Sequence, residues 1–98
     1  MPRAWKGRSG AGELFLLFNC LGCDLPHSVR VLGPEPVWQF NGDWERPTLA
    51  PSIRARWTHG PENSPRVCHS FVKDGRIQYL ADCTHALAGQ TVDLPEVS

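Results

Sequence analysis

Long apolar runs are missing from this chain of 98 residues. The longest one, residues 14–18, is far shorter than the roughly 20 residues that a helix needs to cross a bilayer. Basic residues precede the run as in a secretory signal, but the run is too short for such a signal and a Cys-x-x-Cys follows it instead of a cleavage site. We therefore expect a cytoplasmic protein with no membrane segment.

An excess of charge of either sign is missing too. Lysine and arginine together number 10, as do aspartate and glutamate, so the net charge at pH 7 is +0. Such a chain has no overall field that would draw it to nucleic acid or to an anionic membrane. Glycine-rich phosphate loops, paired acids in a suitable register and a Ser-His-Asp arrangement are not recognisable either. An enzyme of these classes is therefore not favoured.

The chain does contain 9 glycines, 9 prolines and 4 cysteines. A chain of this length forms one domain with a small core, and the high share of glycine and proline predicts many turns and few helices. We expect a mainly β fold, with a small antiparallel sheet of β-hairpins stapled by a zinc site. Residues 1–12 are basic and lack periodicity, which predicts a flexible tail before a single domain at 13–98.

The clearest local signal is a β-hairpin about Asp74-Gly75, a dipeptide that suits a type I′ turn because both central residues need positive φ. Strands at 68–73 and 76–81 would place Cys83 diagonally on the same face as Cys68, at the open end of the hairpin. The cross-strand partners expected from this turn are Lys73 and Arg76, Val72 and Ile77, Ser70 and Tyr79, and Cys68 and Ala81.

Shorter β signals surround the hairpin. We expect strands at 14–19, 27–32, 37–40 and 90–94, and one helical turn at 84–89. Residues 52–57 alternate, with Ile53, Ala55 and Trp57 on one face and Arg54 and Arg56 on the other, as in a half-exposed strand.

Cys20 and Cys23 resemble a zinc knuckle, in which a tight turn directs both thiolates to one ion. Together with the diagonal pair, the predicted ligands for Zn²⁺ are Cys20, Cys23, Cys68 and Cys83. His69 and His85 are alternatives for the fourth position. His69 directly follows Cys68 and would point away from it on a regular strand.

Two catalytic hypotheses use the same residues. A cysteine nucleophile could have a histidine base, as Cys83 with His85 or Cys68 with His69, but no third orienting group is evident. A zinc ion with one open position could instead activate water, which would make the chain a zinc-dependent hydrolase.

Arg54, Arg56 and Trp57 are the residues expected to bind a partner, because arginine and tryptophan are enriched at interaction hot spots. Since the net charge is zero, we favour a protein partner or self-association over nucleic acid. A nucleic-acid-binding zinc module is the alternative.

Several segments carry a resemblance to known proteins: Phe18-Asn19-Cys20-Leu21-Gly22-Cys23, Pro47-Thr48-Leu49-Ala50-Pro51-Ser52-Ile53, Cys68-His69-Ser70-Phe71-Val72 and residues 82–92. Over about residues 14–95 the chain resembles a family of small phage and prophage proteins of unknown function, often automatically labelled "ammonia monooxygenase". A chain without a spanning helix does not support that label. The resemblance implies a phage accessory protein in the host cytoplasm and favours His69 as a ligand. We therefore expect a non-enzymatic, zinc-binding module that modulates a host process such as defence.

Overall fold

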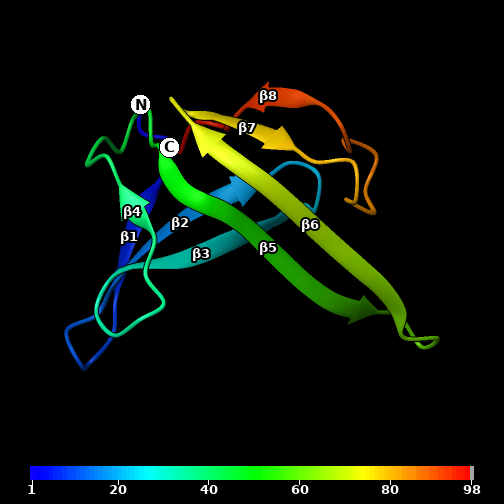
Figure 1. Cartoon of the computed structure of the whole chain (residues 1–98), viewed down its shortest axis with the longest axis horizontal. Coiled ribbons are helices and arrows are strands. Elements are labelled where there is room, and N and C mark those ends of the chain that lie inside the picture. Colours follow the sequence, from blue (N-terminus) through cyan, green and yellow to red (C-terminus); the bar gives the residue numbers. More distant parts are fainter. Residues whose placement is uncertain (98) are drawn as a thin grey trace.

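The structure, a computed structural model, describes residues 1–97 (Figure 1). Those residues form two antiparallel sheets and no helix, which confirms the expected mainly β fold. The first sheet has the order β1-β2-β3, with β1 (Trp5–Arg8), β2 (Leu14–Cys20) and β3 (Leu25–Leu32). The second has the order β4-β5-β6-β7-β8, with β4 (Gln39–Phe40), β5 (Leu49–His59), β6 (Ser64–Lys73), β7 (Arg76–Tyr79) and β8 (Thr91–Asp93). Residues 84–89, expected as a helical turn, form bends and turns.

Strand β1 lies inside the stretch expected as a flexible tail. It pairs with β2 from Trp5 opposite Leu17 to Arg8 opposite Leu14. The backbone N–H groups of Arg3 and Ala4 donate to the Trp44 carbonyl at 2.9 and 3.2 Å, and Ala4 is buried. These contacts attach the N-terminal segment to the rest of the fold.

The Asp74-Gly75 hairpin forms as predicted. Both turn residues have positive φ, 51° for Asp74 and 76° for Gly75, and β6 pairs with β7 in the expected register from Lys73–Arg76 to Ser70–Tyr79. The strand pairing ends there, because β7 stops at Tyr79 and the chain turns at residues 81–82. The expected pair of Cys68 and Ala81 therefore does not form, and the diagonal position of Cys83 is lost with it.

The core lies between the two sheets, where the long strands β5 and β6 cross over β2 and β3 (Figure 1). Its fully buried side chains come from both sheets and include Leu16, Phe18, Val72, Ile77 and Tyr79. Along β5, Ile53 is buried, Ala55 and Trp57 are half-buried, and Arg54 and Arg56 are exposed. This is the alternation that the sequence predicts for a half-exposed strand.

A β-bulge interrupts β5 before this regular part. Leu49 is opposite Val72 and Ile53 is opposite Ser70, so residues 50–52 of β5 face only Phe71 of β6. A bulge bends its strand and re-aims the side chains within it. Ser52, the last residue of the bulge, is half-buried.

Candidate functional site

Four side chains with metal-binding atoms meet at one end of the interface between the sheets. They are Cys20, Cys23, Cys68 and His85, and their ligand atoms all lie within 4.8 Å of one another. The Cys20 and Cys68 sulfurs are 3.8 Å apart, and the Cys68 sulfur lies 3.5 Å from His85 Nε2. A tetrahedral zinc with Zn–S bonds near 2.3 Å keeps neighbouring sulfurs about 3.8 Å apart. The donor set and its spacing therefore fit zinc.

The turn between β2 and β3 places the first two cysteines. Cys20 is the last residue of β2, and the N–H of Asp24 donates to its carbonyl at 2.9 Å, which closes the turn around Cys23. The His85 ring lies directly over this turn, because a Cβ on Gly22 would come within 2.3 Å of the imidazole. Only glycine leaves room for the ring at this position.

The His85 ring is held by two further contacts. The N–H of Leu87 donates to its Nδ1 at 3.2 Å, and the Tyr79 ring packs edge-on with centroids 4.5 Å apart. Because Nδ1 accepts this bond, the neutral ring carries its proton on Nε2. A metal ion at Nε2 would move that proton to Nδ1, and the contact with Leu87 would then loosen.

The three cysteines of the cluster differ in their pKa values. The hydrogen bond from the Cys68 thiol lowers the pKa of Cys20 to about 3. Burial raises the pKa of Cys23 to about 12, and the nearby charge of Cys20 adds to the increase. The pKa of Cys68 is raised too, first by its hydrogen bond to Cys20 and then by burial. Cys20 is therefore the cysteine of the cluster that most readily carries a negative charge.

The Tyr79 hydroxyl stabilises the negative charge of Cys20 by a hydrogen bond. Burial and the hydrogen bond to Cys20 raise the pKa of the Tyr79 hydroxyl, so it stays protonated. It lies 3.2 Å from the Cys20 sulfur, to which it donates, and it accepts the N–H of Gly22 at 3.2 Å. One buried hydroxyl therefore links the knuckle to β7.

Cys83 lies outside the cluster. Its sulfur is 3.2 Å from both the nitrogen and the carbonyl oxygen of His69, so it accepts from the one and donates to the other. The structure therefore does not bring the expected four cysteines together, and of the two alternative fourth ligands it brings in His85. The reason is the turn after Tyr79, which carries Cys83 to the backbone of His69 and His85 to the side chain of Cys68.

His69 belongs to a second arrangement, on the opposite face of β6 from Cys68. Its Nε2 lies 3.1 Å from Ser52 Oγ. Its Nδ1 lies 3.1 and 3.3 Å from the two carboxylate oxygens of Asp82. The three side chains form one continuous hydrogen-bonded chain of serine, histidine and carboxylate, which is the arrangement of a catalytic triad.

Three local features bring Ser52, His69 and Asp82 together. The bulge in β5 supplies Ser52, and the pairing of Arg54 with His69 brings β6 alongside. The N–H of Leu80 donates to the His69 carbonyl at 2.9 Å, and the N–H of Cys83 donates to Leu80 at 3.2 Å. These bonds hold the turn that carries Asp82 next to the imidazole.

The sequence-based expectation that no Ser-His-Asp arrangement is present is wrong. Ser52 and His69 are 17 residues apart, and His69 and Asp82 are 13 apart, on two strands and a turn. No single segment signals the triad, because Ser52 and His69 meet only when β5 pairs with β6.

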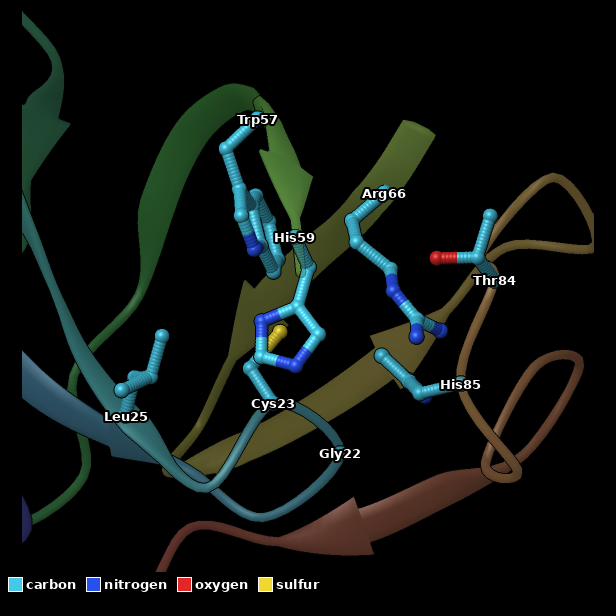
Figure 2. A pocket seen from close by; sticks show the side chains of 8 residues that line it. All are labelled: Gly22, Cys23, Leu25, Trp57, His59, Arg66, Thr84 and His85. Carbon is cyan, nitrogen blue, oxygen red and sulfur yellow. The ribbon is translucent and has the colours of Figure 1, made fainter. Parts of the chain in front are cut away.

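The three residues expected to bind a partner divide between two faces. Arg54 and Arg56 are exposed on the face of β5 that also carries His69. Trp57 points to the other face, where it lines a pocket of about 250 Å³ together with Cys23, Arg66 and His85 (Figure 2). The pocket therefore opens beside the metal-binding cluster, away from the triad.

Within residues 1–97 no helix is long and apolar enough to span a membrane. The comparisons found no match among curated proteins or solved structures. One family model does match, that of the bacterial ubiquitination-like system serine protease (BubE), over residues 4–80. This span includes Ser52 and His69 and ends two residues before Asp82. The match does not confirm the phage family suggested by the sequence. The chain belongs to the BubE family.

Proposed function

We propose that this protein is a serine protease in which Ser52 is the nucleophile, His69 the general base and Asp82 the group that orients His69. The observation that carries the proposal is the continuous hydrogen-bonded chain from Ser52 Oγ through both nitrogens of His69 to Asp82. The description of the matching family as a serine protease of a bacterial ubiquitination-like system also supports it.

The roles follow from the positions of the protons. Asp82 accepts Nδ1–H of neutral His69, which leaves the lone pair of Nε2 to accept the hydroxyl proton of Ser52. As Ser52 Oγ attacks a peptide carbonyl, this proton moves to Nε2, and the carboxylate stabilises the imidazolium that forms. His69 then gives the proton to the leaving amine. Water repeats the sequence with the acyl-enzyme and regenerates Ser52.

The metal-binding cluster has a supporting role in this proposal. Cys20, Cys23, Cys68 and His85 would hold one zinc ion, and a closed set of four sulfur and nitrogen ligands supplies structural stability rather than a water for hydrolysis. The cluster and the triad share β6 and the segment after β7. Fixing Cys68 and His85 therefore also fixes the backbone that carries His69 and Asp82.

The sequence alone favoured a non-enzymatic binding module of phage origin. A triad at hydrogen-bond distance has no evident use in such a module, so we place proteolysis first. The family description names a bacterial ubiquitination-like system. We extend this context to the present chain and propose that its substrate is a protein of such a system.

A fluorophosphonate probe, which labels activated serines, tests the proposal on the zinc-loaded protein. The expected result is a single label that mass spectrometry assigns to Ser52. Ser52→Ala should lose the label, and Asp82→Asn should slow labelling and peptide hydrolysis about 10²–10⁴-fold. Ser28→Ala, an exposed serine on β3, is the matched control and should label normally. Wild-type protein that stays unlabelled, or that labels equally after Ser52→Ala, would refute the proposal.

A further inference from the structure

Strand β5 has a neighbouring strand on only one side beyond the bulge. Strand β4 pairs with Leu49 and Ala50 alone, and the ladder pairs of residues 53–59 are all with β6. In the part of the chain that the structure describes, no other backbone group bonds to the backbone of residues 53–59. An open strand edge therefore begins next to Ser52.

The contacts of β6 show which groups point to this edge. The N–H and carbonyl of His69 are bonded to Cys83 and Leu80, and those of Val67 are bonded to Thr84, so both residues direct their backbone groups away from β5. In an antiparallel ladder, opposite residues either exchange their backbone bonds or both point away. The partners of His69 and Val67 are Arg54 and Arg56. These two arginines therefore present their N–H and carbonyl groups to the open edge.

The edge also carries positive charge. Arg54 and Arg56 are exposed, and neither forms a side-chain hydrogen bond or ion pair with any residue from 1 to 97. Because Arg54 is directly opposite His69, its side chain lies on the same face as the triad. Two unpaired guanidinium groups thus follow the nucleophile on one side, two residues apart along the same strand.

We infer that the substrate binds as an added antiparallel strand on the open edge of β5, with acidic side chains at alternate positions that contact Arg54 and Arg56. An antiparallel chain would run from Arg56 toward Ser52, so these acidic residues precede the bond that is cleaved. Alternate residues of a strand are about 6.7 Å apart, which matches the spacing of the two arginines. Backbone bonds would supply the register and the guanidinium groups the selectivity.

This inference rests on the proposed function only for the place of the cleaved bond. The recognised ligand is an extended acidic segment, such as the flexible tail of a protein. A ligand of this kind agrees with the expectation from the sequence that Arg54 and Arg56 bind a protein. Trp57 faces the other side of the sheet and does not contact this ligand.

Cleavage of a degenerate decapeptide library, read by mass spectrometry, tests the selectivity. Wild-type protein should enrich Asp and Glu at alternate positions before the cleaved bond. Arg54→Glu combined with Arg56→Glu should invert this preference toward Lys and Arg, and the ratio of the two preferences should change about 100-fold. Lys6→Glu with Arg8→Glu changes the net charge equally on exposed positions of β1 and should keep the wild-type preference.

A binding measurement separates this inference from catalysis. Ser52→Ala should bind a fluorescein-labelled peptide of alternating Glu and Ala, and the double arginine reversal should weaken binding about 100-fold. Methylating every second backbone nitrogen of the peptide should abolish binding in one of the two possible registers and not in the other, because only one set of amides faces β5. Equal loss in both registers, or no dependence on the arginines, overturns the inference even if the protein cleaves peptides. If fluorophosphonate labelling fails, the proposed function falls, and the binding result still decides this inference.

Discussion

Replacing Gly22 by alanine tests whether His85 is a metal ligand. The added Cβ would lie 2.3 Å from a carbon of the imidazole. Carbon atoms pack at about 3.5 Å, so the ring has to move by about 1 Å. A metal–ligand distance tolerates only about 0.2 Å, so the moved ring no longer coordinates. We expect zinc affinity to fall about 100-fold or more, which is about 3 kcal/mol or more at 1.4 kcal/mol for each factor of ten.

Two measurements check this expectation: competition for zinc with a chromophoric chelator, and thermal unfolding with and without zinc. Gly22→Ala should lower the melting temperature of the zinc-loaded protein and change that of the metal-free protein far less, because a free imidazole can rotate away. Gly10→Ala is the control, since a Cβ there meets nothing within 4 Å. If Gly22→Ala keeps wild-type zinc affinity, His85 is not a ligand and the four-cysteine set becomes the better hypothesis.

Two other side chains give independent predictions. Cys83→Ala removes the sulfur that bonds both backbone groups of His69, so we expect kcat to fall about tenfold with one zinc still bound, whereas Cys68→Ser should lose the metal. Peptide hydrolysis and metal analysis on the same samples separate the two effects. Loss of zinc from Cys83→Ala would contradict the ligand set. Tyr79→Phe leaves the Gly22 N–H without its acceptor and removes a donor from the Cys20 thiolate. The free energy of unfolding in urea should therefore fall by about 1–3 kcal/mol. An unchanged value would show that water replaces the hydroxyl.

The sequence alone was sufficient to predict those parts of the fold that neighbouring residues determine. Asp74-Gly75 defines its turn through the conformation of two residues, and the register of β6 and β7 follows from that turn. The alternation of Ile53 and Arg54 likewise identifies the two faces of β5 from neighbouring residues alone. The same reasoning correctly placed Cys68 and His69 on opposite faces of the sheet, because adjacent residues of a strand point to opposite faces.

Predicting the metal-binding cluster and the triad required information that no single segment of the sequence carries. The diagonal argument for Cys83 assumed that β7 continues to Ala81, but the chain leaves the sheet after Tyr79. The triad depends on how β5 pairs with β6 around the bulge at residues 50–52, which places Ser52 one diagonal step from His69 instead of directly opposite it. The position of a bulge is a property of two paired strands and of the packing beneath them, so a pattern search along one chain does not find it.

Strand β6 also limits how this protein can evolve. Cys68 lies under the sheet among the metal-binding side chains, and His69, one residue later, lies above it in the triad. Deleting or inserting a single residue just before this pair would exchange the faces of both side chains at once. The proposed metal binding and the proposed catalysis would then be lost together, and restoring either one alone would leave the other side chain misplaced. The two sites are thus inherited as one unit, with little freedom for either to be modified separately.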